Sequence, residues 1–152
     1  MRALTRGLLA GAAGTTALNL VTYGDMLLRA RPASPVPAEV AAGLADRAGV
    51  GLGGGEETSS REQAAGALLG YVTGLGVGAA YGLLRGAGRG RGLPGWLEAP
   101  LLGALAMAGS DVPSAGLGVT DPRTWGADSW VSDVVPHLAY GVVTVAAYRA
   151  LD

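Results

Sequence analysis

An uncharged run of 21 residues, 64–84, limits what this chain can fold into more than any other feature of its sequence. The hydrocarbon core of a bilayer is about 30 Å thick and an α-helix rises about 1.5 Å per residue, so about 20 apolar residues cross it. Arg61, Glu62 and Arg85 flank the run. The sequence therefore predicts a membrane-spanning helix at this position.

Three further stretches are similar to this run. Residues 7–28 contain Asp25 as their only charged residue, whereas residues 99–110 and 134–147 are uncharged but short. The short stretches reach spanning length when one or two turns are added, and the three tryptophans lie near their ends, where interfacial aromatic residues are enriched. We therefore predict an all-α integral membrane four-helix bundle in a single domain, residues 1–152, with spans at about 5–28, 62–85, 94–112 and 129–149.

The composition argues against several classes of function. Only 15% of the residues are charged, the mean hydropathy is +0.34 and the formal net charge is −1, so no basic excess is present to bind nucleic acid. The chain has no cysteine, which removes disulfides and thiolate metal sites. No catalytic motif such as Gly-x-Ser-x-Gly is present. We expect no enzymatic activity, no cofactor and no nucleic-acid partner.

The first predicted span has an alternative interpretation. Arg2 and Arg6 precede an apolar stretch rich in small residues, which is also the pattern of a cleaved signal peptide. The stretch continues past Ala17 to Leu28, which is longer than the apolar part of a signal peptide, and no Ala-x-Ala site ends it. We favour a membrane span, and cleavage stays an open alternative.

The placement of arginine predicts the orientation, because positively charged loops stay in the cytoplasm. The connection between the second and third spans contains Arg85, Arg89 and Arg91, whereas residues 111–133 contain four aspartates and only Arg123. We expect the first of these connections inside and the second outside, which leaves both termini cytoplasmic. The long first connection then lies outside with four arginines and fits the rule least well.

That first connection contains a helical pattern of its own. Val36, Val40 and Leu44 recur at helical spacing beside charged residues. This spacing predicts a short amphipathic helix that lies at the membrane interface. Ser59 and Glu62 then form a predicted capping box for the second span.

The second span has a glycine at every fourth position, and we name this set the glycine seam: Gly66, Gly70, Gly74, Gly78 and Gly82. Residues four apart lie on one face of a helix, so the seam allows another backbone to approach closely. Gly7, Gly11 and Thr15 of the first span form a natural complementary face. Packing within one chain is the interpretation we favour, and a homo-oligomer formed through the seam stays open.

The fourth span carries polar groups at steps of four, three, four and four, and we name this set the polar stripe: Asp133, His137, Tyr140, Thr144 and Tyr148. In hydrocarbon such groups must face protein or water.

The predicted topology also brings one set of ionisable residues to the outer end of the bundle. We name this set the outer cluster: Asp25, Asp111, Asp133 and His137.

The outer cluster has two interpretations. It is a proton or cation site, or a divalent-metal site if Asp111, Asp133 and His137 are ligands, because carboxylate and imidazole groups suit such ions. Alternatively, the carboxylates are solvated and pair with Arg29 or Arg31, while His137 makes a hydrogen bond across the bundle. We favour the second interpretation.

Several short segments resemble one known family. The C-terminal part contains Gly-Val-Thr-Asp-Pro at 118–122, Trp125, Trp130, Ser-Asp at 132–133 and Pro-His-Leu-Ala-Tyr-Gly at 136–141, which is similar to the signature of the YagU-like family. The opening Gly-Leu-Leu-Ala-Gly and the proline-rich segment after the first span are similar too. These are small bacterial inner-membrane proteins of unknown function. The resemblance implies a bacterial inner-membrane protein with several spans and no assigned activity.

The sequence favours two candidate functions. We expect an accessory or structural membrane protein whose partner is the lipid bilayer. The alternative is a proton- or cation-conducting channel or transporter-like module that uses the outer cluster. They differ in whether the polar stripe lines water or packs against protein.

Overall fold

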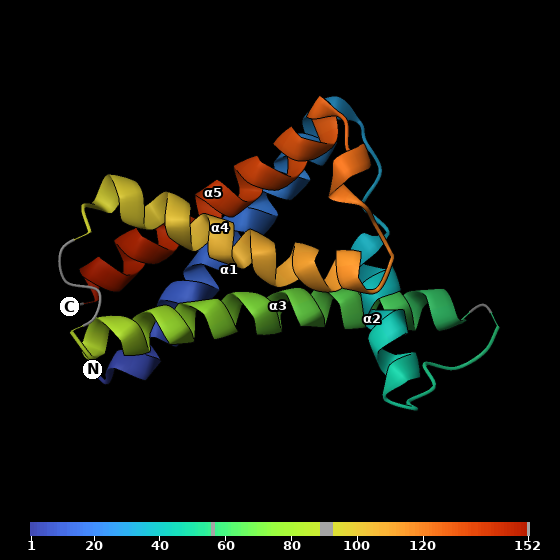
Figure 1. Cartoon of the computed structure of the whole chain (residues 1–152), viewed down its shortest axis with the longest axis horizontal. Helices are drawn as coiled ribbons and strands as arrows, with labels where there is room; N and C mark the ends of the chain where they lie inside the picture. The colour runs from blue at the N-terminus through green and yellow to red at the C-terminus, as the bar shows by residue number, and fades with distance from the viewer. Residues whose placement is uncertain (56, 89–92, 152) are drawn as a thin grey trace.

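The computed structural model describes residues 1–55, 57–88 and 93–151, and this part of the chain is helical and contains no β-strand. Within it, five α-helices and one turn of 3₁₀ helix follow one another (Figure 1): α1 (Ala3–Arg29), α2 (Val36–Arg47), α3 (Glu57–Gly86), α4 (Gly95–Gly116), η1 (Pro122–Thr124) and α5 (Ala127–Ala150). The all-α prediction is therefore confirmed for the described residues.

The predicted elements and the observed helices agree closely in position. One helix covers each predicted span, and α2 is the short helix predicted in the first connection. The predicted capping box is wrong, because α3 begins at Glu57 and so contains Ser59 and Glu62. Arg89 and Arg91, which entered the orientation argument, lie outside the described residues.

Two of the helices, α3 and α5, are long and apolar enough to cross a membrane. The sequence reading predicted four spans, and α1 and α4 do not satisfy the same criterion of length and hydropathy. In the most apolar stretches of α3 and α5, only 22% and 28% of the residues are buried within the molecule. Most residues of these two stretches are therefore not fully buried within the molecule.

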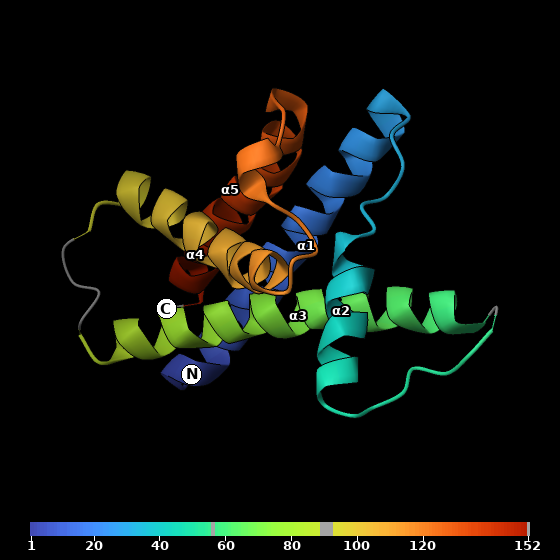
Figure 2. The same cartoon turned by 45° about the vertical axis from the view of Figure 1, so that its right-hand side comes forward.

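The helices converge at one end of the molecule and separate at the other (Figures 1 and 2). The N-terminal and C-terminal residues both lie at the converging end. α1 packs against α3 and α5, and α4 packs against α5. α2 lies across α3 at the open end, and Figure 2 shows this crossing clearly. The chain thus places the start of α5 and the end of α1 together, away from both termini.

α1 and α3 approach each other through their backbones. A Cβ atom added at Gly78 would lie 2.5 Å from the Cα atom of Gly11, and one added at Gly11 would lie 2.7 Å from the carbonyl oxygen of Gly74. Side chains larger than hydrogen do not fit at such distances without movement of the backbone. Thr15 lies against Gly74 on the same face of α1. The face of α1 that contains Gly7, Gly11 and Thr15 therefore packs on the glycine seam of α3, as the small residues of both helices predict.

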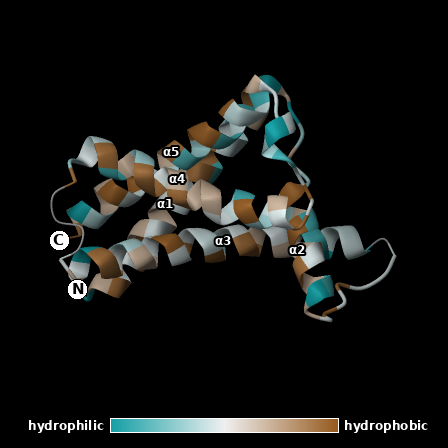
Figure 3. Cartoon of the chain, viewed as in Figure 1, coloured by the Kyte–Doolittle hydropathy of each residue, from teal (hydrophilic) through white to brown (hydrophobic). Residues whose placement is uncertain are grey.

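Large apolar side chains are exposed on each of the five helices, and examples are Leu20, Leu44, Leu68, Leu105 and Val135. Figure 3 shows hydrophobic residues along α3, α4 and α5, with hydrophilic residues gathered toward helix ends and on α2. The buried core is small by comparison and contains three tyrosines, Tyr81, Tyr140 and Tyr148. Monomeric soluble proteins rarely expose apolar surface so extensively.

Candidate functional site

The inner part of the polar stripe is buried against protein. Tyr140, Thr144 and Tyr148 have exposed fractions of 1%, 0% and 2%. The Tyr140 hydroxyl donates a hydrogen bond to the carbonyl oxygen of Gly74 at 2.6 Å, and the Tyr148 hydroxyl donates to that of Gly82 at 3.2 Å. Gly14 of α1 lies against Thr144, since a Cβ atom there would meet the Thr144 hydroxyl. These polar groups therefore join α5 to α1 and α3.

At the outer end, the structure brings three of the four residues of the outer cluster together. Nδ1 of His137 donates a hydrogen bond to the backbone carbonyl of Asp133 at 2.8 Å and lies 3.4 Å from its carboxylate. Asp111, from α4, is close enough to Asp133 and His137 to interact with both electrostatically. The Ser110 hydroxyl donates to the backbone carbonyl of Met107 at 2.8 Å and lies 3.4 Å from the Asp111 carboxylate. The group therefore joins α4 to α5 and contains two carboxylates and one imidazole.

Asp25 belongs to a different set of ion pairs. Its carboxylate accepts hydrogen bonds from Arg29 at 2.6 Å and from Arg31, and both arginines lie beyond it along the chain. Arg29 also donates to the Ser132 hydroxyl on α5 and lies 3.8 Å from Asp128. Asp25 is therefore held by arginines, as the alternative interpretation of the outer cluster expects. His137 makes a hydrogen bond within its own helix, and among the described residues the expected hydrogen bond across the bundle is not found.

No group of three or more histidine, aspartate or glutamate residues in the described part of the chain is arranged to hold a metal ion. Asp111, Asp133 and His137 do not form such a group either. Their proximity therefore does not form a ready set of metal ligands, and the predicted proton or cation site stays a prediction.

The glycine seam lies against two different partners within the chain. Gly74, Gly78 and Gly82 face α1, as described above, while Gly66 faces the backbone of α2 at Pro37. Gly70 has no neighbouring atom within 4 Å of its added Cβ position. Of the five seam glycines, Gly70 is therefore the one that a second chain could contact without displacing α1 or α2.

The sequence reading missed a buried charge cluster at the converging end of the molecule. Glu98 of α4 has a side chain that is only 6% exposed, and its two oxygens face Arg149 at 2.6 Å and Arg85 at 3.2 Å. The Arg6 guanidinium lies 4.0 Å from the ring centre of Tyr148, which packs edge to face on Tyr81 at 5.0 Å. One buried carboxylate thus holds the ends of α3, α4 and α5 together.

A signal for this cluster is present in the sequence. Arg85, Glu98 and Arg149 each stand at the inner end of a predicted span, and the same topology that groups the outer residues places these three together. Opposite charges at the same end of several predicted spans are the pattern that predicts such a cluster.

No family model, no curated protein and no solved structure matches this chain.

Proposed function

We propose that this chain is an integral membrane protein with a structural or accessory role, inserted through α1, α3, α4 and α5 in a bacterial plasma membrane with both termini cytoplasmic. One observation carries the proposal: large apolar side chains are exposed on these helices, while Tyr140 and Tyr148 are buried between them and donate to backbone carbonyl oxygens. A protein in lipid satisfies its polar groups internally and presents apolar side chains outward. The principal partner is the lipid bilayer.

Helix length supports insertion of the two helices that are less apolar. α1 has 27 residues and α4 has 22, which correspond to about 40 Å and about 33 Å at the rise of an α-helix. Both lengths exceed the hydrocarbon thickness of about 30 Å. Most of the charged residues of α1 and α4 lie near the helix ends, as at Arg29 and Glu98. The YagU-like resemblance is consistent with several spans and is part of this proposal.

The burial of the polar stripe favours a structural role over conduction. A pathway for ions requires polar groups that line water along the length of the protein. Tyr140 and Tyr148 instead donate to backbone carbonyls of α3, and Gly14 of α1 lies against Tyr140 and Thr144. We propose that the glycine seam likewise acts within the chain and does not form a homo-oligomer.

Two measurements test this function. The full-length protein, expressed in bacteria, should remain in the membrane pellet after a wash with alkaline carbonate, and release into the supernatant would refute insertion. In proteoliposomes that contain a pH-sensitive dye, the protein should give no proton uptake above that of empty liposomes under an imposed potential. Uptake would refute the purely structural role.

A second function rests on the group formed by Asp111, Asp133 and His137 between α4 and α5. Such a group in a membrane protein can bind a proton or a cation and release it outward. If the protein conducts protons, His137→Ala and Asp111→Asn should each abolish the uptake. Asp121→Asn, at an exposed carboxylate in the loop after α4, is the matched control and should leave the uptake unchanged.

A further inference from the structure

Asn19 is a polar residue near the middle of α1 whose side chain has no hydrogen-bond partner in the part of the chain that the structure describes. The neighbouring Thr15 and Thr16 hydroxyls donate to carbonyl oxygens of their own helix at 2.8 Å and 2.9 Å. Asn19 is half-buried and lies about 5 Å along the helix from the centre of α1. In an inserted protein its carboxamide would therefore be in hydrocarbon with its donors and its acceptor unsatisfied, which is costly.

Asn19 also belongs to a row of residues on α1, none of which is buried, and we name this row the α1 seam: Leu9, Ala12, Thr16, Asn19, Tyr23 and Met26. The steps along the row are three, four, three, four and three residues, which is the spacing of two helices that pack side by side as in a coiled coil. From Leu9 to Met26 the row extends about 26 Å, which is most of the hydrocarbon thickness. The residues that α1 buries against α3 and α5 lie on other faces of the helix. The α1 seam is therefore available to a further helix.

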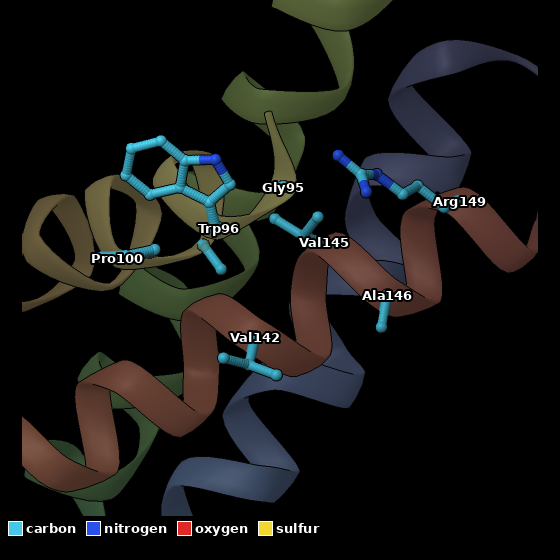
Figure 4. A pocket seen from close by; sticks show the side chains of 8 residues that line it. Gly95, Trp96, Pro100, Val142, Val145, Ala146 and Arg149 are labelled. Carbon is cyan, nitrogen blue, oxygen red and sulfur yellow. The ribbon is translucent and has the colours of Figure 1, made fainter. Parts of the chain in front are cut away.

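The apolar groove between the beginning of α4 and the end of α5 differs from this surface (Figure 4). Arg149 is the charged side chain in its lining, and it already donates to Glu98 at 2.6 Å. The rest of the lining is apolar or backbone, as at Val142 and Val145. The groove thus presents no polar group that requires a partner, whereas the α1 seam presents the Asn19 carboxamide.

We propose that two copies of this chain pair in the membrane along their α1 seams, with the two Asn19 carboxamides joined by reciprocal hydrogen bonds. The proposal rests on the proposed membrane insertion, which gives both copies the same orientation. A carboxamide contains both a donor and an acceptor, so two of them related by a twofold axis complement each other in partial charge and need no group from another protein. Asparagine side chains form such bonds between membrane helices. This surface is separate from the glycine seam, which packs within the chain.

Energy transfer between labelled copies in liposomes measures the pairing. The full-length protein carries a donor or an acceptor dye on Ser129→Cys, an exposed position, and the protein-to-lipid ratio is varied. The parent chain should form dimers, and Asn19→Leu should weaken them about tenfold, since hydrogen bonds between membrane helices contribute about this factor. Asn19→Gln keeps the carboxamide and should retain most of the affinity.

Gln63→Leu is the matched control, because it removes an amide from an exposed position of α3 that is not on the α1 seam. It should leave the dimer affinity unchanged. Energy transfer no higher than random mixing gives, at every protein-to-lipid ratio, would overturn the proposal. The same affinity for Asn19→Leu as for the parent chain would also overturn it.

Cross-linking tests which face of the molecule meets the second copy. Thr16→Cys lies on the α1 seam, whereas Val72→Cys lies on α3, where the valine is 66% exposed. The two positions are at a similar depth, because Thr15 lies against Gly74. Mild oxidation in native membranes should link two chains through Thr16→Cys and not through Val72→Cys, and the reverse result would refute pairing along α1.

A hydrogen bond from Asn19 within one chain is the competing explanation. In mixed micelles dilute enough to separate the copies, Asn19→Leu should unfold at the same sodium dodecyl sulfate fraction as the parent chain, or at a higher one. A loss of stability as large as that of Tyr140→Phe would place the partner inside the chain and refute the pairing. Carbonate release of the protein would refute the proposed function, whereas a carbonate-resistant monomer would refute the dimer alone.

Discussion

The Tyr140 hydroxyl donates to the carbonyl oxygen of Gly74, and eight residues further along both helices Tyr148 makes the same contact with Gly82. The repeat means that α3 and α5 run in the same direction on either side of α1. The phenol groups reach α3 because its glycines leave their carbonyl oxygens accessible to a side chain. Each tyrosine therefore links two helices that have few direct backbone contacts.

Removal of these hydroxyls should weaken the fold slightly. Tyr140→Phe should lower the free energy of unfolding by about 1 kcal/mol, since hydrogen bonds between membrane helices contribute amounts of this size. Tyr148→Phe should have a smaller effect, because its bond is longer at 3.2 Å. Unfolding in mixed micelles with increasing sodium dodecyl sulfate measures both. Tyr23→Phe, at an exposed tyrosine of α1, should change nothing, and an equal loss there would contradict the assignment.

The glycine seam offers a comparison between two identical substitutions. Gly78→Ala should destabilise the protein by about 2 kcal/mol, because the added methyl group would lie 2.5 Å from Cα of Gly11 and would separate α1 from α3. Gly70→Ala has open space around it and should be neutral, or stabilising by up to about 1 kcal/mol through helix propensity. The same unfolding measurement checks both. Equal effects of the two variants would mean that α1 does not pack on the seam.

The positions of the helices could be predicted because the length of an uncharged apolar run is a local property of the sequence. The facing of Gly7 and Gly11 toward the seam could also be predicted, since small residues at four-residue spacing on two helices suit each other. The sequence could not decide that α2 covers Gly66, because that contact depends on the path of a proline-rich connection. The start of α3 at Glu57 was missed for a similar reason: Ser59 and Glu62 fit a capping box but also fit the first turns of a helix.

The candidate sites were predicted less well than the helices. Topology alone places Asp111, Asp133 and His137 together, and it would place Asp25 with them. Asp25 instead pairs with arginines only four and six residues away, because nearby opposite charges compete with distant partners. The Glu98 cluster is the opposite case, since its arginines come from two other helices and its burial depends on how closely the helix ends converge.

Loss of the charge on Glu98 should destabilise the converging end. Glu98→Gln leaves Arg85 and Arg149 facing each other without a carboxylate between them, so we expect a loss of about 2–4 kcal/mol, which is the lower range for a broken buried ion pair because Arg149 is half exposed. The unfolding midpoint in detergent measures this loss. Glu39→Gln, at an exposed position of α2, is the control and should have almost no effect. A similar midpoint for both variants would contradict a structural role of Glu98.

The number of spans is open to a labelling test, because the chain has no cysteine and every introduced thiol is the only one. Ala87→Cys follows α3 and Ser129→Cys stands near the start of α5, and both positions are exposed. If α4 crosses the membrane, the two thiols lie on opposite sides. If only α3 and α5 cross, both thiols lie on the same side.

We expect a membrane-impermeant maleimide to label Ser129→Cys in intact spheroplasts and to label Ala87→Cys only after permeabilisation. Ser34→Cys, in the connection between α1 and α2, should react like Ser129→Cys, since α3 and α4 then both cross between these two positions. Reaction of all three thiols without permeabilisation would contradict four spans. Reaction of Ala87→Cys alone would keep the crossings of α3 and α4 and reverse the orientation, and it would show that the arginines of the first connection outweigh those that follow α3.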